Sequence, residues 1–328
     1  MFATVLAFAV ILLGAYTRLS DAGLGCPDWP GCYGHMTVPE SAGKIQAANQ
    51  AYPDRPVEAA KAWKEMIHRY FAGTLGLSIL ALAGMALFNR KDERQPVLLP
   101  VLLVGVVIFQ ALLGMWTVTL KVMPLVVMGH LIGGFTTLAL LWLLVISTRT
   151  WWLAEERRSG LGLWGLLALL LVVGQIMLGG WTSSNYAALA CPDFPTCHGQ
   201  WWPTMDFAEG FDVWHGTGIN FEYGILDGTA RTAIHMTHRI GALTVTLYLL
   251  FFISRVLRLR NEPVVRRVAI VVLALLGIQI VLGISNVIFH LPLPVAVTHN
   301  GVAALLLLSL LTLLYLLYLQ RRVRGVAL

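Results

Sequence analysis

Charged side chains are scarce in this sequence. Asp, Glu, Lys and Arg together make up 12% of its 328 residues, whereas 57% of the residues are hydrophobic. Because soluble domains carry about 25% charged residues, this composition excludes an ordinary soluble fold. Apolar runs of roughly 17–25 residues, the length that crosses a bilayer, recur along the chain. The sequence therefore predicts an all-α integral membrane protein.

Eight apolar runs are expected to be transmembrane helices. They cover residues 2–18, 66–88, 97–117, 124–147, 161–182, 232–254, 267–288 and 295–319. The first run lacks the basic residues and the small-residue cleavage site of a secretory signal peptide. It is therefore expected to remain in the protein as a transmembrane helix.

Basic residues are distributed unevenly between the connecting segments. Most Lys and Arg lie in residues 89–96, 148–160 and 255–267 and after residue 319. Examples are Arg90, Lys91, Arg157, Arg158, Arg266, Arg267, Arg321 and Arg322. By the positive-inside rule, these segments and both termini face the cytoplasm of a multi-pass inner-membrane protein, and the loops 19–64 and 183–231 face the periplasm. The net charge of +6 thus reflects membrane topology and does not indicate a nucleic-acid partner.

The two halves of the chain carry the same motifs. His68-Arg69 recurs as His238-Arg239, His130 as His299, and the segment Cys26–Cys32 as Cys191–Cys197. Further matches are Gly14 with Gly179, Gln110 with Gln279 and Gly114 with Gly283. Because four spans return the chain to its starting side, the repeat predicts two parallel four-helix bundles related by a pseudo-twofold axis along the membrane normal. The two halves are placed at residues 1–150 and 151–328.

Four histidines lie near the expected outer ends of the even-numbered spans. They are His68, His130, His238 and His299. Two histidines on facing helices can bind a haem iron from both faces, so one pair in each half indicates two haem sites. The residues one helical turn on are all small: Ala72, Gly134, Ala242 and Ala303. They leave room for a macrocycle, although small residues also serve helix packing. A zinc or copper site is disfavoured, because a transporter site would need carboxylates or thiolates beside the histidines and the spans contain almost none.

The two halves differ three residues before the first histidine. Glu65 stands there in the first half and His235 in the second. Residues three apart share a helix face, so Glu65 is expected to point into the pocket of His68, where a carboxylate can move protons. The alternative is an interfacial ion pair of Glu65 with Arg69 or Lys64.

Arg69 and Arg239 each follow a histidine at the expected outer interface. A guanidinium group is well suited to pair with a haem propionate, and the alternative is an arginine that extends to the membrane surface. His235 is expected near a propionate or at the mouth of the pocket.

All four cysteines lie in the two outer loops with C-x5-C spacing. The pairs are Cys26 with Cys32 and Cys191 with Cys197. Because the exterior is oxidising, each pair is expected to form a disulfide. The alternative is zinc, with His35 or His198 as a further ligand, although structural zinc sites favour shorter spacings.

These features together closely resemble the haem A synthase family of bacterial and mitochondrial membranes, over nearly the whole chain. The resemblance is carried by eight spans in two repeated halves, two outer cysteine pairs and the E-x-x-H-R motif at residues 65–69. It implies an oxidoreductase that converts a ring methyl of haem O to a formyl group, giving haem A for cytochrome oxidase. Molecular oxygen and an external electron donor are then expected.

The resemblance also implies a role for each half. His68 and His130 would bind the substrate haem O in the first half, with Glu65 as the catalytic carboxylate. His238 and His299 would bind a permanent haem b in the second half.

Two other functions fit part of the pattern. A bis-haem b electron-transfer cytochrome explains the four histidines but gives Glu65 no purpose. A haem transporter or chaperone would need tryptophan-rich motifs beyond Trp201-Trp202. Besides the lipid bilayer, the candidate partners are haem O synthase, oxidase assembly factors and further copies of this chain.

Overall fold

The computed structural model describes residues 1–92, 95–148, 160–259 and 262–322, which form α-helices joined by loops. The helices are α1 (Phe2–Leu19), α2 (Ala42–Ala51), α3 (Ala59–Phe88), α4 (Leu98–Thr119), α5 (Pro124–Ser147), α6 (Gly162–Ser184), α7 (Phe207–Gly210), α8 (Gly228–Leu257), α9 (Pro263–Ile288) and α10 (Leu293–Arg322). Within these residues only two isolated β-bridges occur, one in each cysteine loop. The all-helical fold expected from the composition is confirmed.

Eight of these helices are long and apolar enough to cross a membrane, and they coincide with the eight predicted spans. The largest difference is at the start of α3, which begins at Ala59 rather than at residue 66. Its first turns contain Lys61 and Lys64, so they carry no hydropathy signal although they are helical. The short helices α2 and α7 lie in the two long loops and were not predicted.

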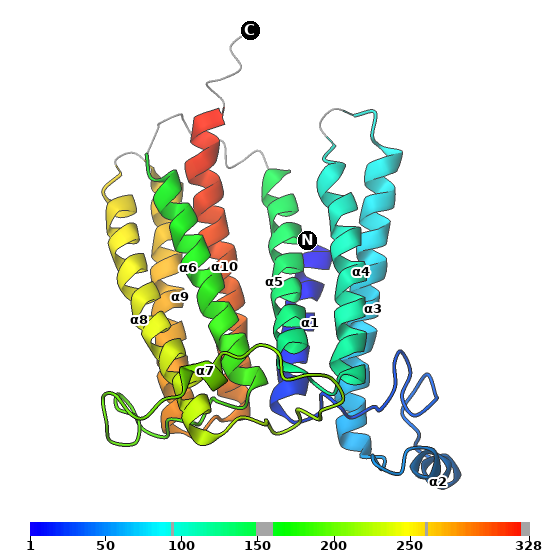
Figure 1. Cartoon of the computed structure of the whole chain (residues 1–328). Coiled ribbons are helices and arrows are strands. Elements are labelled where there is room, and N and C mark those ends of the chain that lie inside the picture. The colour runs from blue at the N-terminus through cyan, green and yellow to red at the C-terminus, as the bar shows by residue number, and fades with distance from the viewer. Residues whose placement is uncertain (93–94, 149–159, 260–261, 323–328) are drawn as a thin grey trace.

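The helices pack in the same pairs within each half. In the first half α1 contacts α3 and α5, and α4 contacts α3 and α5. In the second half α6 contacts α8 and α10, and α9 contacts α8 and α10. The halves meet where α1 packs on α10 and α5 packs on α6 and α10, as the side-by-side bundles in Figure 1 show. The pseudo-twofold relation between the halves stays a prediction.

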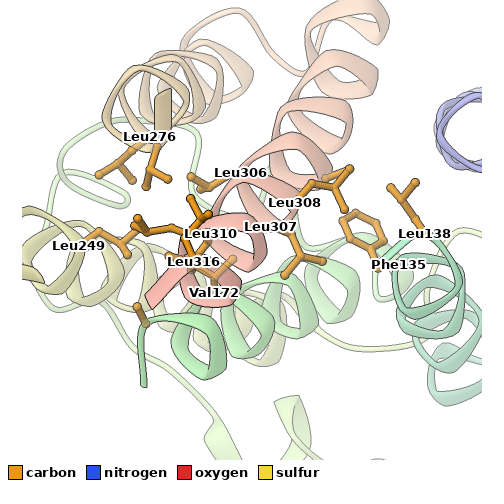
Figure 2. Packing of buried hydrophobic residues seen from close by; sticks show 14 of the residues in the cluster. Phe135, Leu138, Val172, Leu249, Leu276, Leu306, Leu307, Leu308, Leu310 and Leu316 are labelled. Atoms are coloured by element: carbon orange, nitrogen blue, oxygen red, sulfur yellow. The ribbon is translucent and has the colours of Figure 1, made fainter. Parts of the chain in front are cut away.

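Helix α10 forms the centre of the molecule. Its membrane window is 67% buried, against 17–28% for the other seven spans. Leu306, Leu307 and Leu310 of α10 pack with Val172 of α6 and Phe135 of α5 (Figure 2). Since lipid tails are as apolar as these side chains, close packing rather than burial from water favours this association.

Both cysteine loops lie at one end of the bundle, and the C-terminal end of α10 lies at the other (Figure 1). This common placement follows from the even number of spans between the loops. Which end faces the cytoplasm stays a prediction. Arg157, Arg158 and the predicted boundary between the halves at residues 150 and 151 lie outside the described residues.

Candidate functional site

The first histidine pair lies between α3 and α5. The rings of His68 and His130 have centroids 6.5 Å apart and planes at 85°. The Nδ1 atom of each ring is buried without a hydrogen-bond partner. Metal–imidazole bonds of about 2 Å on either side of one ion place ring centroids roughly 6–6.5 Å apart. Two rings at right angles can both contain the bond axis, so this geometry fits axial ligation of a haem iron.

The second pair occupies the matching helices α8 and α10. His238 of α8 and His299 of α10 are the residues that the repeat matches to His68 and His130. The Nδ1 atom of His299 is buried without a partner, as in the first pair. The amide nitrogen of Gln279 lies 3.2 Å from Nε2 of His299. The four histidines therefore form two separate pairs, one in each half.

Each histidine ring lies against a glycine of a neighbouring helix. A Cβ added to the glycine would approach the imidazole Cε1 at Gly14 (3.0 Å from His68), Gly114 (3.4 Å from His130), Gly179 (3.3 Å from His238) and Gly283 (3.3 Å from His299). These distances are tighter than ordinary Cβ contacts, so a larger residue would displace each ring. The repeat of these glycines is visible in the sequence, but their contact with the histidines is not.

Small residues beside the histidines were expected to leave room for a macrocycle. At Gly133 and Gly241, one residue before Gly134 and Ala242, glutamine side chains of neighbouring helices take up this room. The amide of Gln110 lies over Gly133, and the amide of Gln175 lies over Gly241, so that a Cβ at either glycine would collide. No role was predicted for Gln175 from the sequence. The first half has no glutamine at the matching position, and this difference between the halves could have drawn attention to it.

Glu65 lies between the first cysteine loop and Arg69. Its side chain is 6% exposed. Oε2 accepts the backbone N–H of Cys26 at 2.9 Å, and Oε1 is 2.5 Å from Nη2 of Arg69. The ion pair that was the alternative for Glu65 is therefore present, and it compensates the burial of the carboxylate. Lys64 lies over the ring of Tyr16 instead.

His235 occupies the corresponding place in the second half. Its Nδ1 is 3.2 Å from the backbone nitrogen of Cys191, and its Nε2 is 3.3 Å from Nε of Arg239. A neutral imidazole has only one acceptor nitrogen, so it satisfies one of these donors at a time, whereas the Glu65 carboxylate satisfies two. The side chain is buried against the cysteine loop.

The two arginines hold the cysteine loops against the helices. Arg69 Nη1 donates to the carbonyl oxygens of Asp28 (3.0 Å), Pro30 (3.2 Å) and Gly31. Arg239 donates to the carbonyl oxygens of Thr196 (2.8 Å), Asp193 (2.8 Å) and Cys191 (3.1 Å). This role was not predicted from the sequence. The clue to it was that each half contains both an arginine after its first histidine and a cysteine loop.

Both predicted disulfides are formed, Cys26 with Cys32 and Cys191 with Cys197. Each closes a turn that an aspartate caps. Asp193 accepts the Thr196 hydroxyl at 2.5 Å and the backbone N–H groups of His198 and Gly199 at 2.6 and 3.0 Å. The hydrogen bond from Thr196, followed by that from Gly199, lowers the pKa of Asp193 to about 2.

The zinc alternative for the cysteines is wrong, because bonded sulfurs offer no thiolate. Nor does the described part of the chain contain a group of three or more His, Cys, Asp or Glu residues placed to hold a metal ion.

Comparison with known proteins places this arrangement in a family. The family model COX15-CtaA, described as cytochrome oxidase assembly protein, matches residues 1–311. The chain belongs to this family. The matched COX15-CtaA region contains both histidine pairs and both cysteine loops.

Relatives of the same family resemble the chain along most of their length. The protein named Heme A synthase from Shewanella oneidensis is 49% identical over 307 residues, which cover 93% of this chain and 91% of that protein. The Heme A synthase of Caulobacter vibrioides is 28% identical over 326 residues, covering 92% and 89%. That of Allorhizobium ampelinum is 27% identical over 329 residues, covering 92% and 84%.

Proposed function

We propose that this protein is a haem A synthase, an oxidoreductase of the inner membrane that converts a ring methyl of haem O to a formyl group. The observation that carries the proposal is the pair of half-buried imidazoles of His68 and His130, whose ring centroids lie 6.5 Å apart. The repeat places a second pair, His238 and His299, in the other half. The name of the Shewanella oneidensis relative, Heme A synthase, which is 49% identical, supports the same reaction.

The first half is proposed to bind the substrate. His68 and His130 would hold haem O by its iron, and Gly14 and Gly114 set the positions of the two rings. When bound, haem supplies the iron chemistry that oxidises the methyl group with molecular oxygen and electrons from an external donor.

Glu65 is proposed as the catalytic carboxylate of this half. It lies three residues before His68, and the second half has His235 instead. Its Oε1 atom is held by Arg69 and its Oε2 atom by Cys26. A carboxylate at this place can hold or pass a proton at Oε2 when the cysteine loop moves away from it.

The second half is proposed to bind a permanent haem b between His238 and His299. The contact of Gln175 with His238 supports this assignment, because its amide nitrogen lies 3.0 Å from Nδ1 and leaves Nε2 of this ring to the haem. Haem O synthase and oxidase assembly factors are the proposed partners, and the cysteine loops are proposed to face the periplasm.

The test is pigment analysis of the purified protein. Co-expression with a haem O source should give a pyridine haemochrome with a formyl-bearing haem. Glu65→Gln should keep haem b but accumulate unconverted haem O or an alcohol intermediate. Full haem A production by Glu65→Gln would remove Glu65 from the reaction, and a wild-type protein without any haem would contradict the proposal.

One observation favours a second function, a bis-haem b electron-transfer cytochrome. Glu65 has a structural role in holding the Cys26 backbone and Arg69, so its presence does not require catalysis. The same pigment analysis separates the two functions, because an electron-transfer cytochrome yields haem b alone.

A further inference from the structure

The two cysteine turns, residues 26–38 and 191–205, are the least charged parts of the two long loops. Neither contains Lys, Arg or Glu, and each has one Asp and one His, whereas the rest of each loop carries charges of both signs. Each aspartate is bonded to its own turn. Asp28 accepts two backbone N–H groups at 2.6 and 2.7 Å, and Asp193 accepts two at 2.6 and 3.0 Å.

Each cysteine turn also holds large apolar side chains at its surface, and they occupy matching positions of the repeat. In the first turn Trp29 is 40% exposed and Met36 is 76% exposed. Their counterparts in the second turn are Phe194, 45% exposed, and Trp201, 74% exposed, and the adjacent Trp202 is exposed as well. Because both halves repeat this exposure, the cysteine turns form two similar apolar surfaces, and such surfaces mark interaction sites.

Both cysteine turns lie beside a helix at the level where its apolar run begins. Tyr70 Oη donates to the carbonyl oxygen of Met36 at 2.8 Å, and Arg69 Nη1 donates to three further carbonyl oxygens of the first turn. Tyr70 and Arg69 belong to the apolar run at residues 66–88 of α3. Arg239 of α8 likewise donates to three carbonyl oxygens of the second turn. Figure 1 shows the two turns on opposite flanks of the bundle, beside α3 and α8.

A surface of this kind is stabilised at the boundary between lipid headgroups and acyl chains. Tryptophan and other large apolar side chains are favoured at this boundary, whereas charges and polar groups without partners are costly there. In the cysteine turns the aspartates and the carbonyl oxygens that face Arg69 and Arg239 already have hydrogen-bond partners. The disulfides and these bonds also order each turn in advance, so insertion into lipid costs little further conformational entropy.

We propose that both cysteine turns insert into the lipid leaflet at this end of the bundle, with their exposed apolar side chains in contact with lipid. The partner of these two surfaces is the lipid itself. Each turn is bonded to the arginine that follows His68 or His238, so insertion holds the histidine-bearing ends of α3 and α8 at a fixed depth. This inference does not depend on which ligand the histidines bind.

Spin labels on single introduced cysteines test the proposal in lipid nanodiscs that hold one copy of the protein each. All four cysteines of the chain are in disulfides, so each introduced thiol is the only one that is labelled. Labels at Met36→Cys and Trp201→Cys should collide more often with oxygen, which concentrates in lipid, than with a water-soluble nickel chelate. Lys44→Cys and Thr217→Cys, at exposed positions in the remaining parts of the same loops, are the matched controls and should show the reverse.

Tryptophan fluorescence gives a second measurement, which needs no introduced cysteine. Brominated lipids should quench a smaller fraction of the fluorescence when Trp201→Phe and Trp202→Phe are combined. Trp214→Phe, at an exposed position of the same loop, should not lower the quenched fraction. Nickel access at Met36→Cys or Trp201→Cys equal to that at Lys44→Cys would overturn the inference. A partner protein or a second copy as the occupant of these surfaces would give that result, because each nanodisc holds a single chain.

Discussion

Arg55 in the first outer loop forms an ion pair with Glu222 in the second, with Nη2 of Arg55 2.6 Å from Oε2 of Glu222. Arg55 Nη1 also donates to the carbonyl oxygen of Leu24 at 2.9 Å. The hydrogen bond to Glu222 raises the pKa of Arg55. The pair joins segments 167 residues apart, so it fastens the outer loop of one half to that of the other.

Removal of this pair should loosen the contact between the loops. Glu222→Gln should lower the free energy of unfolding by about 1 kcal/mol at most, because the side chains are 30% and 12% exposed and exposed ion pairs contribute less. A double-mutant cycle with Arg55→Gln measures the coupling by thermal unfolding in detergent. The control is Glu58→Gln, which breaks the more exposed pair with Lys61 and should change little. Equal effects of Glu222→Gln and Glu58→Gln would contradict this role.

The second cysteine loop should loosen at low pH because of Asp193. Its pKa is lowered from 3.8 to about 2 in the folded protein, so its ionised form stabilises the loop above about pH 4. This contribution is lost as the pH falls through 2, when protonation removes the acceptor for the backbone N–H groups of His198 and Gly199.

Hydrogen exchange of residues 191–200, followed by mass spectrometry and corrected for intrinsic rates, measures this loosening. Protection should fall between pH 4 and pH 2 in the wild type. Asp193→Asn should have low protection that is independent of pH in this range. A wild-type loop whose protection is unchanged at pH 2 would show that the ionised aspartate does not hold the turn.

A methyl group at Gly179 should disturb the ring of His238, which is proposed to bind haem b. Gly179→Ala places a Cβ 3.3 Å from Cε1 of His238, so the ring must shift by a few tenths of an ångström. We expect haem affinity in this half to fall by about tenfold or more, as for other changes that reorient a metal ligand. Spectroscopic haem titration of the apoprotein measures the effect.

Gly174→Ala is the matched control on the same helix, because nothing lies within 4 Å of a Cβ there. It should bind haem as the wild type does. Equal affinities for Gly179→Ala and Gly174→Ala would mean that the glycine does not set the position of the ring.

The eight spans could be predicted from the sequence because membrane insertion depends on the length and polarity of each run alone. The predicted helix ends were least accurate where polar residues are helical. The first turns of α3 contain Lys61 and Lys64, so the apolar run begins later than the helix. Both disulfides were predictable for a similar reason, since Cys26 and Cys32 are close along the chain and need no distant partner.

The four histidines and Glu65 also stood out in the sequence, because ionisable residues are rare in apolar segments and the repeat set them in register. Their surroundings were decided by the tertiary structure. Glu65 meets the Cys26 backbone across 39 residues, and Gln175 meets His238 across 63. Such contacts depend on how the helices pack, which local periodicity does not encode. Local composition is enough to predict which residue types enter the membrane, whereas the residues that hold the histidines in place depend on how the helices pack.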